Sequence, residues 1–231
     1  MLQDASHLNL RDMASGTQDH LNLSHLTERP VAHRDEAWEI EFLRALPKSR
    51  IRVLEDAPAA GPDGWPYLMV STEGAVDDSV SNIADWLASR GVGFVVNPEK
   101  SLPDFVLSYG MVWNFRERGE FLTPAAKAAT GKLEIRDGQQ LYTGSPSTAY
   151  LPEDVRTVLR DFFKRQRVFE PRVLMISTDQ QTWDLAFSVE SMGAPPEKEH
   201  AGIAEAISWF LPAHYSVAII SEKTVPGFTA L

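Results

Sequence analysis

The sequence contains no cysteine. A chain without thiols forms no disulfide, offers no thiolate to a metal ion and has no cysteine nucleophile. Basic residues are also scarce, because 22 Lys and Arg stand against 32 Asp and Glu, which gives a formal net charge of −10. Since binding to a phosphate backbone requires clustered positive charge, this balance argues against a nucleic-acid-binding protein.

Long apolar runs are missing too. No stretch approaches the roughly 18 consecutive apolar residues of a membrane-spanning helix, so the sequence predicts no contact with a membrane. The first residues, MLQDASHLNLRDMASG, lack the basic start and the continuous apolar segment of a secretory signal. We therefore expect a cytoplasmic protein, and a hydrophobic content of 43% with 23% charged residues is typical of a folded globular chain.

Familiar catalytic and cofactor motifs are missing as well. The chain has no GxSxG nucleophile elbow, and its Gly131-Lys132 step is followed by leucine instead of the Ser or Thr of a phosphate-binding loop. The segment GVGFVV has two glycines, but it precedes a strand and lacks the third glycine of a dinucleotide-binding fingerprint. The sequence accordingly predicts no cofactor, no metal site and no catalytic residue.

The histidines are distributed unevenly. Four of the six lie within residues 1–33, at spacings that match no compact pair of metal ligands. We expect residues 1–33 to be a poorly ordered or loosely packed arm, with a metal-binding or partner-binding arm as the alternative. The other two, His200 and His214, border a predicted helix and strand, and we interpret them as structural. A hydrolase that pairs one of them with a carboxylate is the least favoured function.

The chain after the arm alternates between helical and strand patterns. Apolar residues recur at helical spacing in AWEIEFLRALPKS and again over 77–91, whereas RIRVLE and YLMVST are typical of strands. GFVVN (93–97) and DFVLSYGMVWNF (104–115) are apolar, β-branched and aromatic, and they predict two further strands. The predicted order of this first unit is α-β-β-α-β-β.

A second unit follows FLTPAAKAATG (121–131), whose proline and closing glycine predict an exposed connection. KLEIRDGQQLYTG predicts two short strands about the Asp137-Gly138 turn. Pro152 begins a helix with acidic residues at its start and basic residues at its end. RVLMIS and TWDLAFSVES predict strands, and a helix at 197–211 precedes a strand at 215–221. The β-α-β-β-α-β order is that of the ferredoxin-like arrangement.

These patterns predict an α+β protein with two similar-sized domains and mainly antiparallel sheets. Residues 34–125 are expected to form the first domain, after the arm at 1–33. Residues 126–231 are expected to form the second domain, with the ferredoxin-like arrangement.

A partner-binding surface is predicted at two loops. Trp65 lies in the loop GPDGWPY, and an aromatic residue in such a loop is a common anchor for a partner protein, with packing back over the sheet as the alternative. Pro98 lacks a backbone donor and restricts Asn97, which ends the strand and places Glu99 and Lys100 on a projecting turn. We expect Trp65, Asn97, Glu99 and Lys100 to lie on a common edge and to contact another protein.

Two segments resemble a known family. GVGFVVNPEKSLPDFVLSYGMVWNF (91–115) resembles the N-terminal domain of the SseB family, in which a strand ends in an Asn-Pro turn and leads into a second strand. QQLYTGSPSTAYLPEDVRTVL (139–159) resembles the start of that family's C-terminal domain, and RVLMIS and the helix and strand of 197–221 continue the pattern. The resemblance covers both domains in order, between residues 36 and 225.

The resemblance implies a protein of the kind named for enhanced serine sensitivity, some of whose members are described as secretion-associated. It implies no catalytic residues. We therefore predict a non-catalytic cytoplasmic protein that acts through protein–protein contacts in a regulatory or secretion-associated role. A small-molecule sensor is the first alternative, and the family's name suggests an amino acid as its ligand. The sequence predicts no oligomeric state.

Overall fold

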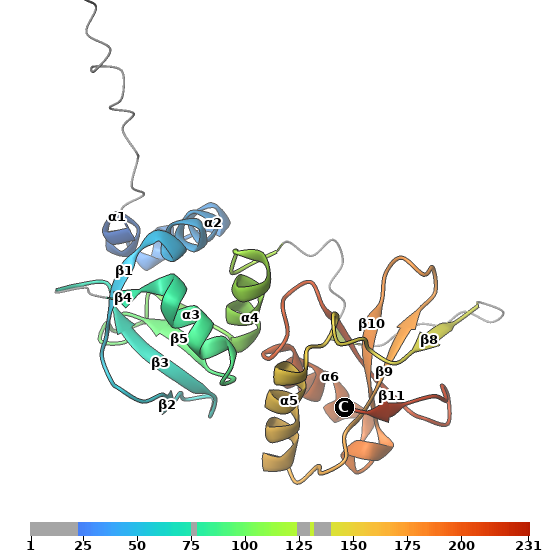
Figure 1. Ribbon diagram of the computed structural model, residues 1–231. Coiled ribbons are helices and arrows are strands. Elements are labelled where there is room, and N and C mark those ends of the chain that lie inside the picture. The colour runs from blue at the N-terminus through green and yellow to red at the C-terminus, as the bar shows by residue number, and fades with distance from the viewer. Residues whose placement is uncertain (1–22, 75–77, 124–129, 132–139) are drawn as a thin grey trace, which may run out of the picture.

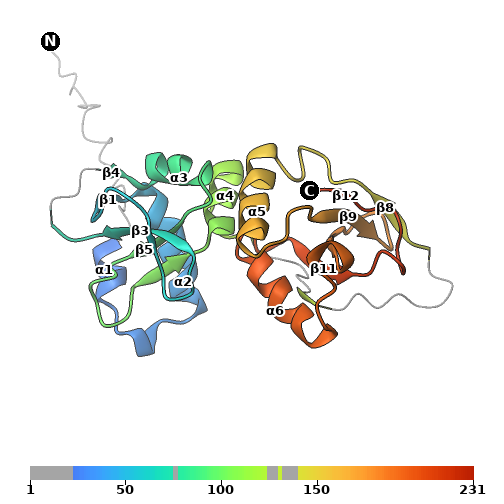
Figure 2. The same cartoon turned by 90° about the horizontal axis from the view of Figure 1, so that it is seen from below.

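The computed structural model describes residues 23–74, 78–123, 130–131 and 140–231. Within these ranges the chain has six α-helices and two mixed sheets, which confirms the predicted α+β fold class. Figures 1 and 2 show the N-terminal sheet with its helices beside the C-terminal sheet with its own. No helix in the described ranges is long and apolar enough to cross a membrane.

The N-terminal sheet has the strand order β4-β1-β3-β5-β6, and β2 pairs with β3. The strands β3 and β5 are parallel, and the other pairs are antiparallel. A parallel pair requires a crossover connection, which here is helix α3 (Val80–Ala88). The strands are β1 (Arg50–Val53), β2 (Ala59–Ala60), β3 (Pro66–Ser71), β4 (Asp78–Ser79), β5 (Gly93–Val96) and β6 (Phe105–Leu107).

Helices α1 (Leu23–Glu28) and α2 (Glu36–Ala45) pack with α3 against this sheet. The short helix η1 (Val31–His33) connects α1 to α2, and η2 (Leu46–Lys48) leads from α2 into β1. Asp35 begins α2, because its carboxylate accepts a hydrogen bond from the amide of Trp38. Leu23 and Leu26 are buried in the first core. Residues 23–33 of the predicted arm therefore belong to the folded body, whereas residues 1–22 lie outside the described residues.

The segment 104–115 is not the single strand that we predicted. Strand β6 ends at Leu107, and helix α4 (Tyr109–Arg118) follows. Ser108 begins the helix by accepting a hydrogen bond from the amide of Met111, and Gly119 ends it in the left-handed conformation. The prediction is wrong because α4 is apolar on two sides, so its sequence lacks the alternation of an amphipathic helix.

The C-terminal sheet has the strand order β12-β9-β10-β11-β7, and β8 pairs with β9. Helices α5 (Glu153–Arg165) and α6 (Glu197–Ser208) supply the apolar side chains of the second core, and η3 (Glu190–Met192) follows β10. The strands are β7 (Thr130–Gly131), β8 (Tyr142–Gly144), β9 (Arg172–Ser177), β10 (Asp184–Ser188), β11 (Ser216–Ile220) and β12 (Thr229–Ala230). The predicted Asp137-Gly138 turn lies outside the described residues.

The elements β8-α5-β9-β10-α6-β11 follow one another as predicted, but their pairing is not ferredoxin-like. Strands β10 and β11 are adjacent and parallel, and β8 is antiparallel to its neighbour β9. In the split arrangement another strand lies between the two parallel strands of a β-α-β unit. The ferredoxin-like prediction is therefore corrected to an unsplit β10-α6-β11 unit. The order of elements along a chain does not determine which strands become neighbours.

Helix α4 packs into both cores. Val112 lies in the first core, whereas Tyr109 and Trp113 lie in the second. The amide of Gly110 donates to the carbonyl oxygen of Trp209, with a distance of 3.0 Å between nitrogen and oxygen. In Figures 1 and 2, α4 lies where the two halves of the chain meet. A helix from the predicted first domain thus completes the core of the second half.

Candidate functional site

The four residues predicted to bind a partner do not share one edge of the sheet. Trp65 immediately precedes β3, whereas the amide of Asn97 binds the carbonyl oxygen of Val70 near the other end of that strand. A strand of six residues spans about 20 Å. The expectation of a common edge is wrong because β3 and β5 are parallel. The start of one strand and the end of its parallel neighbour fall at opposite ends of a sheet.

Trp65 contacts other aromatic side chains of its own chain. Its ring stacks on Trp209 with 5.5 Å between centroids, and it meets Phe162 and Phe210 edge-on at 5.3 and 5.2 Å. Beside it, the indole N–H of Trp209 donates to the hydroxyl of Tyr67 at 3.0 Å. We call these five residues the aromatic joint. They hold the loop before β3 against helices α5 and α6, so the ring of Trp65 already has partners within the chain.

Asn97 occupies an unusual backbone conformation at the end of β5. Its φ angle is +53°, in the left-handed region that asparagine tolerates better than most residues, and it is fully buried. The side-chain Oδ1 accepts a hydrogen bond from the amide of Thr72 at 2.7 Å. The Nδ2 donates to the hydroxyl of Thr72 at 2.8 Å and to a carboxylate oxygen of Asp104 at 2.5 Å. The buried amide therefore fixes the turn that sequence analysis singled out.

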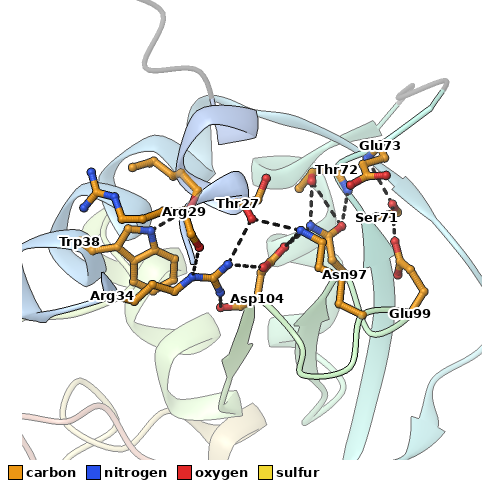
Figure 3. Close-up of polar contacts among 12 residues, drawn as sticks. Thr27, Arg29, Arg34, Trp38, Ser71, Thr72, Glu73, Asn97, Glu99 and Asp104 are labelled. Carbon is orange, nitrogen blue, oxygen red and sulfur yellow. Dashed lines mark hydrogen bonds and ion pairs between the residues drawn. The ribbon is translucent and has the colours of Figure 1, made fainter. Parts of the chain in front are cut away.

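Asp104 is the centre of a buried charge cluster at this turn (Figure 3). Its side chain is 1% exposed, and its two carboxylate oxygens bind Arg34 at 2.7 Å and Lys100 at 2.6 Å. A buried carboxylate is costly unless charged and hydrogen-bonding partners surround it. Here two cations and the amide of Asn97 supply those partners. We call Arg34, Asn97, Lys100 and Asp104 the Asp104 cluster.

The cations of the cluster also bind the end of helix α1. The guanidinium of Arg34 donates to the carbonyl oxygens of Thr27 and Arg29, at 3.1 and 3.0 Å. The ammonium of Lys100 donates to the same Thr27 oxygen at 3.2 Å. The cluster thus ties the α1–α2 connection to the loop between β5 and β6, which are far apart in the sequence.

Glu99, the fourth predicted residue, lies beside the cluster. Its carboxylate accepts a hydrogen bond from the hydroxyl of Ser71 at 2.9 Å, and this hydroxyl also accepts from the amide of Glu73. Because Ser71 is the last residue of β3, this contact joins the turn to the end of the strand (Figure 3). Asn97, Glu99 and Lys100 are therefore brought together, as expected, without Trp65.

Three exposed apolar side chains belong to the segments that the cluster joins. Val31 lies between Arg29 and Arg34 and is 53% exposed. Leu102 lies between Lys100 and Asp104 and is 59% exposed, and Val106 on β6 is 47% exposed. We call Val31, Leu102 and Val106 the β6 surface.

Sequence reasoning missed Arg34 and Asp104. They are 70 residues apart, and each resembles an ordinary surface charge when the sequence is read locally. The one local indication is the position of Asp104 directly before the apolar strand β6, where a charged residue requires a partner. Their pairing becomes visible only once α1 is placed against the β5–β6 loop.

The two histidines of the C-terminal half occupy separate places. The Nε2 of His200 lies 3.0 Å from the carbonyl oxygen of Pro195. His214 precedes β11, and its ring meets Tyr215 edge-on. In the part of the chain that the structure describes, no group of three or more His, Asp or Glu residues could hold a metal ion.

No protein-family model matches the chain, and the curated proteins and solved structures give no significant match. The resemblance to the SseB family therefore stays a prediction.

Proposed function

We propose that the protein is a non-catalytic cytoplasmic binding protein whose β6 surface contacts another protein. One observation carries this proposal: the buried Asp104 cluster joins two distant segments, and both present exposed apolar side chains. We also propose an SseB-like protein in two domains, on the resemblance of residues 91–115 and 139–159 to that family.

The energetics of the cluster favour a role in fixing geometry. A buried ion pair adds little net stability, because the desolvation of both charges offsets their attraction. A non-glycine residue with positive φ also costs energy, and it persists only where the surroundings hold it. Here both features lie at the same turn. Their result is a rigid loop that requires no ordering when it meets a partner, which favours affinity.

The surface has the composition of a protein-binding site. The segments that carry its apolar side chains also carry charged groups, such as the exposed carboxylate of Glu99. Leu102 is the most exposed of the three apolar residues and stands on the loop that the cluster fixes. We therefore expect Leu102 to lie at the centre of the contact.

The absence of cysteine allows a direct test. The variant Leu102→Cys carries a single thiol, to which a photoreactive benzophenone maleimide can be attached. Irradiation in a cell extract should yield one defined protein adduct. The matched control is Phe169→Cys, because Phe169 is 74% exposed but lies in the C-terminal half. The control should not yield the same adduct.

A second substitution relates the adduct to the cluster. Asp104→Asn in the Leu102→Cys background should reduce the adduct, provided that circular dichroism shows a folded chain. Equal adducts from Leu102→Cys and Phe169→Cys would contradict the proposal, as would the lack of any defined adduct.

A small-molecule sensor is the second candidate function. A cleft lined by residues of α4 and of the turn before β11, none of which belongs to the Asp104 cluster, favours it.

A further inference from the structure

Two adjoining hollows lie between the C-terminal end of α4 and the turn before β11. One has a volume of about 300 Å³ and the other of about 690 Å³, within the range of ligand sites. Arg118, His214 and Tyr215 line both. We call the two hollows together the α4–β11 cleft.

Among the residues that the structure describes, three buried side-chain polar atoms without a hydrogen-bond partner belong to residues at this cleft. They are the Nε1 of Trp113, the Oδ1 of Asn114 and the Nδ1 of His214, and all three residues line the smaller hollow. Trp113 is 1% exposed and Asn114 is 2% exposed. Buried polar groups in native proteins nearly always have partners. Three such atoms at one cleft make it the place where we look for a ligand.

The orientation of Asn114 is determined by its other contacts. Its Nδ2 donates to the carbonyl oxygen of Glu120 at 2.8 Å and to the hydroxyl of Thr123 at 3.0 Å. Both N–H groups are thereby used, so the atom left for a ligand is an acceptor. The indole N–H of Trp113 is a donor and nothing else. The residues that line the smaller hollow therefore include one unpartnered donor and one unpartnered acceptor.

Aromatic rings form a wall of the cleft. The hydroxyl of Tyr215 donates to the carbonyl oxygen of Tyr150 at 2.6 Å, and the two rings lie 4.6 Å apart between centroids. Trp183 lines the larger hollow beside them. A wall held in this way can stack a planar ring without rearrangement. Charges of both signs, from Arg118 and Asp184, line the larger hollow, so neither a strong anion nor a strong cation is favoured.

We propose that the α4–β11 cleft binds a small, uncharged planar molecule that carries an amide-type donor and acceptor, such as an aromatic carboxamide or a lactam. The carbonyl oxygen of the ligand accepts from the indole N–H of Trp113. Its N–H donates to the Oδ1 of Asn114, and its ring packs on the aromatic wall. This proposal stands apart from the protein contact at the β6 surface, which uses other residues.

Benzamide is a suitable probe, and the tryptophan indole N–H signals in ¹⁵N–¹H NMR spectra are the readout. The chain has six tryptophans, and the variant Trp113→Phe identifies the signal of Trp113. Benzamide should shift this signal in a saturable manner at millimolar concentrations. The signal of Trp86, which is 39% exposed in α3 and belongs to the other half, should stay unchanged.

Two analogues of benzamide keep its ring but change its amide group. They therefore test the hydrogen bonds of the ligand separately from the packing of its ring. N,N-dimethylbenzamide keeps the carbonyl but lacks the N–H, and benzoate replaces the amide by a charged acceptor. Each should bind roughly tenfold more weakly or worse, because the acceptor of Asn114 then stays buried without a partner. Because these comparisons use the unmodified protein, they hold even if a variant at Asn114 fails to fold.

Three outcomes would overturn the proposal. The first is no shift of the Trp113 signal by benzamide, and the second is equal binding of benzamide and its dimethyl analogue. The third is a saturable shift with an α-amino acid such as L-phenylalanine but none with benzamide, which would assign the cleft to zwitterionic ligands. None of these outcomes bears on cross-linking at Leu102.

Discussion

The two ends of strand β3 are held by different physical means. At its start, the aromatic joint packs the loop of Trp65 against α5 and α6 through ring contacts of 5 to 6 Å. At its end, the Asp104 cluster fixes the turn after β5 through short, directional contacts between charges. The joint is a contact within the chain. The cluster leaves apolar side chains exposed beside it, so it can serve a contact with another molecule.

The largest expected effect on the free energy of unfolding is at Gly110, where the two halves of the chain are in close contact. A Cβ atom added at Gly110 would lie 2.0 Å from the backbone carbonyl oxygen of Leu211, so the backbone would have to shift. Gly110→Ala should lower the free energy of unfolding by about 4 kcal/mol in urea titrations. It should also weaken the ring contacts of the aromatic joint, which a change in tryptophan fluorescence would report.

The matched control is Gly202→Ala. Gly202 lies in helix α6, and an added Cβ would meet no atom within 4 Å. Alanine in a helix interior is more favourable than glycine, so this variant should be more stable by about 0.5 to 1 kcal/mol. Equal effects of the two substitutions would show that the halves do not fit closely at Gly110.

The next largest effect is expected at the Asp104 cluster. Asp104→Ala leaves the guanidinium of Arg34, whose side chain is 10% exposed, without its carboxylate partner. Removal of one member of a buried ion pair should cost about 3 kcal/mol in a urea titration, because the remaining charge stays desolvated. Asp104→Asn keeps the size and some hydrogen bonds, so it should cost less. A loss under about 1 kcal/mol for Asp104→Ala would show that the cluster acts as a surface ion pair.

A smaller effect is expected at the joint. Trp65 is half-buried, so Trp65→Ala should destabilise the protein by about 2 kcal/mol, less than full burial would imply. Trp65→Phe keeps an aromatic ring against Trp209 and should recover most of this loss. Differential scanning calorimetry measures both variants. An unchanged melting temperature for Trp65→Ala would support the original prediction of a free partner-binding anchor.

The sequence predicts most elements of this fold but not how they combine. Capping residues and apolar spacing locate helices α2, α5 and α6 correctly, because their other faces are polar. Helix α4 is missed because it contacts two cores and has no such polar face. Strand neighbours are missed for a related reason, since pairing depends on contacts between residues far apart in the chain.

The candidate site shows the same limit. Asn97, Glu99 and Lys100 could be predicted, because the Asn-Pro step ends the strand through the properties of adjacent residues alone. Asp104 and Arg34, which organise that turn, could not. Their contact spans 70 residues and depends on the position of α1. The placement of Trp65 failed because a loop position alone does not tell which half of the protein the ring meets.

The smallest expected effect is a pH dependence of the free energy of unfolding, which arises from His214 at the α4–β11 cleft. Burial, with a smaller contribution from the positive charge of Arg118, lowers the pKa of His214 below its usual value, and Glu120 opposes this weakly. Between the lowered pKa and the unfolded value of about 6.5, the unfolded chain binds more protons than the folded one. Stability from this residue is therefore present above pH ~6.5 and falls as the solution is acidified.

The variant His214→Phe isolates this contribution. Phenylalanine keeps a ring beside Tyr215, which His214 meets edge-on at 5.0 Å, but it does not titrate. Between pH 7.5 and pH 5.5, the unmodified protein should lose more stability than the variant, because only the unmodified protein carries the imidazole of His214. Urea titrations at the two pH values measure the difference. Parallel losses would place the imidazole in contact with water in the folded protein, and the α4–β11 cleft would then lack one of its three unpartnered polar atoms.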